Sequence, residues 1–254
     1  MKNFHHHRLY RVLPLATVLL FACHESNSMR PLDSSKYFAS AEVAVFVDDI
    51  QRGDLARVKK GLAAGISANA TGTQGFRPIH FVFAAKDAEV LKLLLAAGAD
   101  PMARLENGNT PLHFGARMPN PEFTRVLLAA GADPNAQGAN HKPVVEEALG
   151  SEEPENLRLL SRAGANLNVV WGGSSLLMSA IITSSWDMAV SLLDLNADLG
   201  YRDNLGAGAV DKFCAKVRKV TPTDTNRKGI PALNSAFKRR GVTVPCETEM
   251  QKFR

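Results

Sequence analysis

Histidine is the residue type in this sequence best suited to metal or proton chemistry. Three of the seven histidines form the run His5–His7, and the others are His24, His80, His113 and His141. Zinc sites need several ligands at bond lengths of about 2 Å, yet the sequence has no His-Glu-x-x-His and no Cys-x-x-Cys motif. A Gly-x-Ser-x-Gly elbow and a phosphate loop are missing too. We therefore expect no enzyme, no cofactor and no metal site.

Two of these histidines lie in a repeated pattern. Pro78 and His80 recur 33 residues later as Pro111 and His113. One phase of the pattern is marked by Gly65, Gly98, Gly131, Gly164 and Asn196. A fixed period of this length is typical of a solenoid, in which each unit stacks on its neighbours.

Within one period the apolar residues adopt helical spacing. The segment 86–98, "KDAEVLKLLLAAG", has a wide apolar stripe and ends at Gly98, where a left-handed residue would close a helix. The preceding helix starts at Pro78 or Pro111, since proline is tolerated in a first helical turn. Each unit is therefore predicted as helix, turn, helix and polar loop.

The repeated sequence motifs resemble those of one family. Thr110-Pro111-Leu112-His113, its looser copy from Arg77 to His80, and the Gly-Ala-Asp matches are similar to the ankyrin repeat. The resemblance covers roughly residues 41–245 and implies an all-α ankyrin-repeat solenoid with short hairpin-like loops. It also implies that His80 and His113 hydrogen-bond nearby backbone.

Five to six units are expected, and the later copies depart from the family pattern. We predict a signal peptide over 1–23, a flexible tether over 24–40, ankyrin repeats over 41–210 and a divergent capping repeat with a tail over 211–254. Near the end, the segment 220–229 resembles an insertion, and a last helix is predicted from Pro231 onward.

The family usually binds proteins with its loops and the first helix of each unit. Carried over to this sequence, that surface has the following candidates: Phe76, Arg104, Leu105, Glu106, Phe114, Arg117, Met118, His141, Glu147, Trp171, Tyr201 and Arg202. Trp171 is the strongest candidate, because exposed aromatic residues often anchor interfaces. The alternatives are that Trp171 folds over the next repeat and that Phe114 is buried between units. Glu147 is expected to point toward the groove.

The amino terminus looks like an export signal. A basic stretch without acids is followed by an 11-residue apolar run and then by Cys23. This run is too short to span a bilayer. Residues 20–23, Leu-Phe-Ala-Cys, resemble a bacterial lipobox, which implies lipidation of Cys23 and a periplasmic protein tethered to a membrane, with the outer membrane favoured. Soluble export and an uncleaved anchor are the alternatives.

Removal of the signal changes the cysteine count and the charge. Only Cys214 and Cys246 would remain besides Cys23, and they form either a disulfide or two buried thiols. The remaining chain has 27 basic and 25 acidic residues, so its near balance gives no reason to expect nucleic-acid binding. The basic run Lys238–Arg240 suits either a solvated face or anionic headgroups.

Short exported ankyrin proteins resemble two bacterial classes. One class comprises immunity proteins that block antibacterial effectors in the periplasm, including lipases of the type VI secretion system. The other comprises periplasmic ankyrin scaffolds and oxidative-stress proteins. We expect the first: a non-enzymatic protein, monomeric when free, that binds a secreted effector. A hydrolase or metal enzyme on a repeat scaffold is the remaining alternative.

Overall fold

The structure is a computed structural model that describes residues 31–85 and 88–253. The predicted signal peptide, the candidate lipid site Cys23 and residues 24–30 of the predicted tether lie outside the described residues. No helix within the described ranges is long and apolar enough to cross a membrane.

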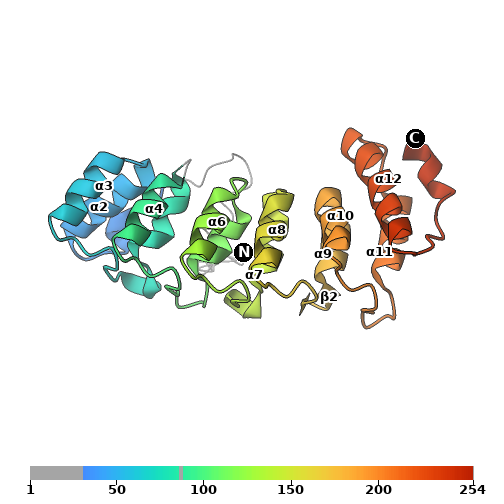
Figure 1. The fold of residues 1–254 in the computed structure, drawn as a ribbon, viewed down its shortest axis with the longest axis horizontal. Coiled ribbons are helices and arrows are strands. Elements are labelled where there is room, and N and C mark those ends of the chain that lie inside the picture. The colour runs from blue at the N-terminus through green and yellow to red at the C-terminus, as the bar shows by residue number, and fades with distance from the viewer. Residues whose placement is uncertain (1–30, 86–87, 254) are drawn as a thin grey trace, which may run out of the picture.

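The described helices form pairs that stack in a single row (Figure 1). The first helices of the pairs are α2 (Ala41–Arg52), η3 (Pro78–Ala84), α5 (Pro111–Arg117), α7 (Val144–Ala148), α9 (Leu176–Ile182) and α11 (Ala209–Lys219). The second helices are α3 (Leu55–Ala63), α4 (Glu89–Ala96), α6 (Glu122–Ala129), α8 (Pro154–Arg162), α10 (Trp186–Asp194) and α12 (Asp224–Arg239). The all-α solenoid predicted from the sequence is confirmed.

Short elements complete the chain between and around these pairs. They are the 3-10 helices η1 (Ser34–Lys36), η2 (Thr73–Gly75), η4 (Ala139–His141), η5 (Leu149–Ser151) and η6 (Glu249–Phe253), and the strands β1 (Val170–Trp171) and β2 (Ser174–Ser175). The two strands pair in antiparallel fashion as a hairpin.

The second helices of the first five pairs end as the periodic glycines and Asn196 predict. Gly98 has φ +81°, its N–H donates to the Leu95 carbonyl at 3.0 Å, and the Ala99 N–H donates to the Leu94 carbonyl at 2.9 Å. These bonds satisfy carbonyls that the helix itself leaves unpaired. Gly65, Gly131, Gly164 and Asn196 have φ values between +63° and +92° and occupy the same position in their own units. The residue that recurs with the 33-residue period is therefore the one that ends the second helix of each of these units.

Packing runs from unit to unit along the row. Second helices contact second helices, as in α4 with α6, α6 with α8, and α10 with α12, while α5 contacts η3 and α7, and α9 contacts α11. The buried residues form one continuous apolar cluster from Tyr37 to Phe253. No unit encloses a core by itself, so neighbouring units stabilise each other.

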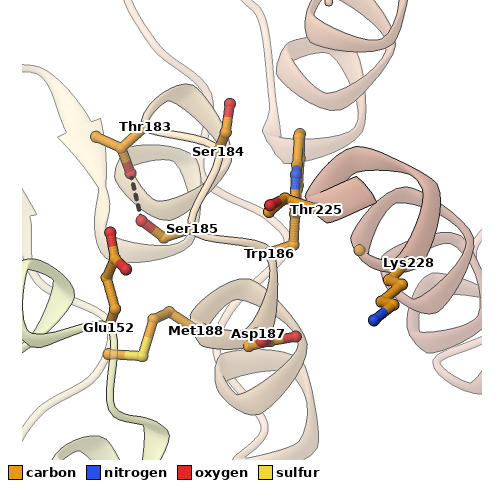
Figure 2. A pocket seen from close by; sticks show the side chains of 10 residues that line it. Glu152, Thr183, Ser184, Ser185, Trp186, Asp187, Met188, Thr225 and Lys228 are labelled. Carbon is orange, nitrogen blue, oxygen red and sulfur yellow. Dashed lines mark hydrogen bonds between the residues drawn. The ribbon is translucent and has the colours of Figure 1, made fainter. Parts of the chain in front are cut away.

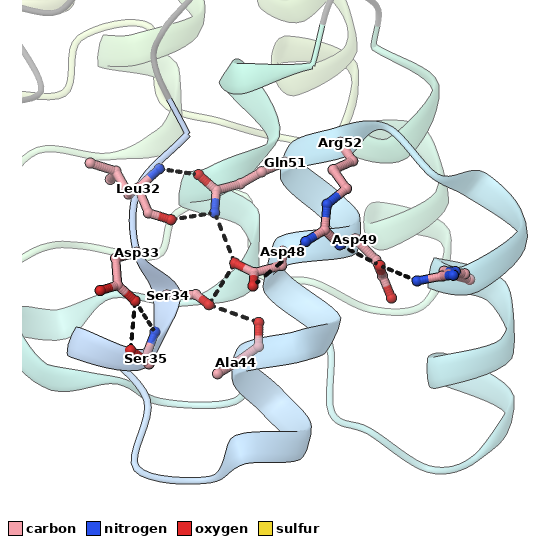
Figure 3. A network of polar contacts seen from close by, with 10 residues as sticks. Leu32, Asp33, Ser34, Ser35, Ala44, Asp48, Asp49, Gln51 and Arg52 are labelled. Carbon is pink, nitrogen blue, oxygen red and sulfur yellow. Dashed lines mark hydrogen bonds and ion pairs between the residues drawn. The ribbon is translucent and has the colours of Figure 1, made fainter.

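The predicted tether ends earlier than residue 40. Tyr37 and Phe38 are buried, and both rings contact Phe81 on η3. Ser34 Oγ lies within hydrogen-bond distance of the Ala44 carbonyl at 2.8 Å and of Asp48 Oδ1 at 2.7 Å on α2 (Figure 3). The side chain of Gln51 accepts from the backbone N–H of Leu32 at 2.6 Å. Residues 32–38 therefore belong to the folded domain, because a hydrogen-bond network holds them on α2 and two aromatic rings pack on the second unit.

The last helix also differs from its prediction. It begins at Asp224 after the capping residue Thr223, so residues 224–229 are helical and Pro231 lies inside α12. The helix packs on α10, and the Trp186 indole N–H donates to Asn226 Oδ1 at 2.9 Å. The predicted boundary at residue 210 falls inside α11. The final pair therefore continues the row.

Cys214 and Cys246 form a disulfide, with a Cα–Cα distance of 5.5 Å. Cys214 lies on α11, and Cys246 lies in the segment between α12 and η6. The disulfide therefore fastens the carboxyl-terminal segment to the last pair of helices.

Candidate functional site

The loops between successive units lie along one edge of the row, at the bottom of Figure 1. Most of them close through a similar backbone bond. Leu105 N donates to the Asn109 carbonyl, Gly138 N to the Lys142 carbonyl and Asp203 N to the Ala207 carbonyl, each at 2.9 Å. This edge holds the loop residues that the resemblance assigned to partner binding.

The loop around Trp171 is a tight hairpin. Val170 pairs with Ser175 and Trp171 with Ser174, and the two residues at the turn, Gly172 and Gly173, have φ values of +57° and +78°. A turn with positive φ at both positions strongly favours glycine, which explains the Gly-Gly sequence here. The hairpin fixes the direction of the Trp171 side chain.

Trp171 leans on the preceding loop, so the alternative that it folds over the next repeat is wrong. Its indole N–H donates to the Asn140 carbonyl at 3.1 Å, and Lys142 Nζ lies 5.2 Å from the ring centroid. The ring is half-buried. This contact is a cation–π interaction of the kind worth about 1 kcal/mol at a partly exposed site.

The sequence suggested that Glu147 offers its carboxylate to the groove. In the structure Glu147 is buried, and its carboxylate is not free. It is 5% exposed, and its carboxylate lies 3.0 Å from Lys142 Nζ and 3.4 Å from Arg117 Nη1. Two cations around one buried carboxylate compensate its loss of hydration. Lys142 therefore connects Trp171 to a charge cluster on α5 and α7.

Glu146, the neighbour of Glu147, is also buried. Burial raises the pKa of the Glu146 carboxyl to about 7, although the hydrogen bond from Ser179 Oγ at 3.1 Å opposes that shift. A carboxyl with this pKa is largely neutral in mildly acid conditions. Glu146 therefore adds little fixed negative charge to the surface.

Four apolar candidates are buried, so their prediction as partner-binding residues is wrong: Phe76, Leu105, Phe114 and Met118. The Phe76 ring lies 4.5 Å from the Tyr37 ring, and Phe114 stacks on Phe83 at 5.7 Å between centroids. Leu105 and Met118 belong to the same apolar cluster. Stacking of units removes these side chains from solvent, so their role is to pack neighbouring units.

The other candidates remain accessible in whole or in part. Arg104, Glu106, His141 and Arg202 are exposed, whereas Arg117 and Tyr201 are half-buried. Arg104 Nη1 donates to the carbonyls of Gly108 at 3.0 Å and Gln137 at 3.1 Å, and therefore connects two loops. Tyr201 donates its hydroxyl to the Gly173 carbonyl at 3.2 Å, and Arg202 lies 3.8 Å from Asp211.

Two members of this surface were missed in the sequence. Leu205 is 88% exposed at the tip of the loop closed by Asp203 and Ala207, and Lys142 contacts both Trp171 and Glu147. A leucine beside Asn204 and Gly206 in a polar turn was the available signal for Leu205. Lys142 gave no comparable signal, because its contact with Trp171 comes from the next unit and its contact with Glu147 depends on how the loop meets α7.

A separate pocket of about 310 Å³ lies between α10 and α12 (Figure 2). Glu152, Asp187 and Lys228 line it, and the hydroxyls of Thr183 and Ser185 lie 3.0 Å apart. Among its lining residues there is no histidine or cysteine, so it has no nucleophile paired with a neighbouring imidazole base. Within the described ranges, no three His, Cys, Asp or Glu side chains group to hold a metal ion.

The comparisons with known proteins identify part of the chain. A family model described as ankyrin repeats matches residues 47–138 in 3 copies. The search of curated proteins found no match. Ankyrin repeats indicate a protein–protein interaction module, and members of the family are typically non-enzymatic. Residues 47–138 are therefore ankyrin repeats, and the chain folds as an ankyrin-repeat solenoid.

Proposed function

We propose that this protein is an immunity protein of the bacterial envelope that binds and occludes an antibacterial effector acting in the periplasm. A lipase delivered by the type VI secretion system is the first candidate effector. In this proposal the chain is exported, carries lipid on Cys23 and is held at a membrane, with the outer membrane favoured. It blocks the effector by covering its active-site entrance and catalyses no reaction itself.

The observation that carries the proposal is the row of loops with anchors of different chemistry. Leu205 and Trp171 supply apolar and aromatic area, while Glu106 and His141 supply exposed polar groups. These residues come from four different loops spread along the row. A surface of that extent fits a folded protein better than a small molecule, for which pockets are concave and enclosed.

Two further features support a place in the envelope. The amino-terminal 23 residues resemble a lipoprotein signal, and the disulfide between Cys214 and Cys246 fits an oxidising compartment. A tether would hold the protein where an incoming effector arrives. Neither feature distinguishes an immunity protein from an envelope scaffold, so the partner must decide between them.

The decisive experiment is capture of the partner. Residues 24–254 serve as bait for periplasmic and secreted fractions, and bound proteins are identified by mass spectrometry. One stoichiometric toxin or lipase that loses activity on binding is the expected result. A spread of envelope or redox proteins, with no inhibited partner, would contradict immunity and favour the scaffold.

A paired variant locates the binding surface once the partner is known. Trp171→Ala combined with Glu106→Lys should weaken binding by about 30-fold, which corresponds to about 2 kcal/mol. Lys59→Glu on α3, an exposed charge change away from the loops, is the matched control. Arg104 is left intact because its loss would also release the carbonyls of Gly108 and Gln137. An unchanged affinity would place the interface on another face.

A further inference from the structure

The outer face of the first unit holds an apolar groove. It lies between α2 and α3 at the end of the row, has a volume of about 610 Å³, and is lined by Ala41, Val45, Phe46, Ala64 and Ile66. Val45 is 58% exposed, and among the large apolar side chains of the described residues only Leu205 is more exposed. End units of a solenoid normally present a polar outer face to solvent.

Glycine at position 61 shapes the floor of this groove. A Cβ placed on Gly61 would lie 2.6 Å from Phe46 Cδ2, so only glycine lets the Phe46 ring lie against α3. The Phe46 ring itself is buried, and the accessible apolar area comes from Val45 and Ile66. The groove is thus a hollow between two helices, open to solvent on its outer side.

Charges of opposite sign border the groove on its two helices. Glu42 stands on α2 and Lys60 on α3, both exposed, and within the described part of the chain neither side chain has a hydrogen-bond or ion-pair partner. Asp49 on α2 lies 3.5 Å from Arg57 on α3, so these two charges already form an ion pair within one chain. The acidic side of the groove is therefore α2, and the basic side is α3.

We propose that this groove binds a second copy of the same chain, end to end across a two-fold axis. An axis parallel to the two helices places α2 of each copy over α3 of the other. Glu42 of each copy then faces Lys60 of the other copy, and both Val45 side chains become buried in the contact. A two-fold contact uses the same patch twice, and this patch is complementary to itself in charge.

The contact covers one end of one unit and is therefore small. Interfaces of this class are weak, so we expect dissociation constants of roughly 10 µM to 1 mM in solution. Tethering both copies to one membrane would raise their effective concentration. This inference replaces the expectation of a monomer, and it does not depend on the proposed function, because the loop surface lies on a different edge.

The test measures association of residues 24–254, which include every described residue, by sedimentation velocity over a concentration series. Val45→Lys should lower the association constant at least tenfold, since a charge would enter the apolar contact. Glu42→Lys and Lys60→Glu should each lower it by about fivefold, because both symmetric pairs become repulsive. The double variant with both changes should recover association to within about twofold.

Two controls separate this contact from other association. Lys59→Glu changes the same charge one residue away without lining the groove, and Ile182→Lys changes an exposed apolar residue far along the row. Both should associate like the unchanged chain. Association that survives Val45→Lys, or a double variant that is not rescued, would overturn the proposal.

A monomer at every concentration would overturn it as well, and one more measurement would then reassign the groove. Thiol labelling of Val45→Cys that is fast in the folded monomer would leave the groove open for a different protein. Slow labelling would instead assign it to a segment of the same chain. Both results exclude the second copy as the occupant.

Discussion

His80 and His113 are structural residues in this protein. Arg77 N donates to His80 Nδ1 at 3.0 Å, and His80 Nε2 lies 3.1 Å from the Ala103 carbonyl in the next loop. His113 repeats the arrangement with Thr110 N at 3.1 Å and the Lys142 carbonyl at 3.4 Å. These contacts require a neutral ring with its proton on Nε2. The role implied by the family resemblance is confirmed.

The buried histidines should make stability depend on pH. Burial lowers the pKa of both rings to about 4, so the folded state stays neutral while the unfolded state gains protons below pH 6.5. Stability is therefore complete above pH 6.5 and falls as the pH drops toward 4. Glu146 opposes the fall, because its raised pKa of about 7 makes the folded state bind a proton first.

Glu146→Gln separates these opposing effects. At pH 5 the two histidines together should cost about 4 kcal/mol of unfolding free energy, and Glu146 should return about 2–3 kcal/mol. The unchanged protein should then lose on the order of 1 kcal/mol between pH 7 and pH 5, and Glu146→Gln clearly more. Urea unfolding at both pH values measures this, and identical pH slopes for the two proteins would contradict the role of Glu146.

At the scale of elements, asparagine side chains join neighbouring units. Asn135 Nδ2 donates to the Gly164 carbonyl at 3.0 Å, and its Oδ1 accepts from Asn166 N at 2.8 Å. Asn69 makes the same two bonds to Gly98 and Asp100 at 2.7 and 2.9 Å. Asn168 accepts from Asp198 N at 2.8 Å. At position 102 of this series, Met102 Sδ accepts from Asp133 N instead.

Asn135→Ala should therefore lower the free energy of unfolding. Two side-chain bonds to the next unit are lost at a partly solvated site, so the expected cost is about 1 kcal/mol. Met102→Asn, which supplies the missing asparagine, should stabilise the chain or leave it unchanged. Thermal unfolding of the two variants is the measurement. A stabilising effect of Asn135→Ala would show that these bonds do not join the units energetically.

The approach of α12 to α10 depends on Gly229. A Cβ at this position would lie 2.3 Å from Trp186 Cδ1 and 2.4 Å from Trp186 Cβ. Gly229→Ala should therefore force the two helices apart and cost about 1–3 kcal/mol, although alanine favours a helix. Ala232→Gly, at an exposed site on the same helix, is the control for helix propensity. Equal stability of Gly229→Ala and the unchanged chain would mean that α12 packs elsewhere.

At the scale of the whole molecule, the disulfide holds the closing segment of the row. Val244, Met250 and Phe253 of this segment are buried against the last units, and Cys246 connects it to Cys214 on α11. Because units are stabilised by their neighbours, loss of an end cap weakens the units beside it first. The disulfide should therefore matter most for the carboxyl-terminal units.

Replacement of both Cys214 and Cys246 by alanine should destabilise the chain by about 2–4 kcal/mol. Hydrogen exchange should rise in α11, α12 and residues 242–253, while α5 and α6 keep their protection. A reductant should lower the unfolding temperature of the unchanged protein and have no effect on the double variant. A uniform rise in exchange along the row would contradict a local role for the disulfide.

The sequence by itself determined the architecture of this protein. The 33-residue period, the prolines that start first helices and the glycines that stop second helices are local signals, since each depends on the backbone geometry of a few neighbouring residues. Gly98 with its positive φ and His113 with its backbone bonds both lie where the repeat pattern placed them. Local rules of this kind can be read before any contact is known.

Only the tertiary structure decided which side chains are accessible to solvent and which contact residues of a neighbouring unit. Phe114 and Glu147 occupy equivalent positions one period apart, and both are buried, one against Phe83 and the other between Lys142 and Arg117. Trp171 turned toward the preceding loop, and Leu205 remained in solvent. Exposure depends on what the adjacent unit places opposite each residue, and that contact spans about 30 residues of sequence. The repeat pattern describes one unit, whereas the surface is produced by two.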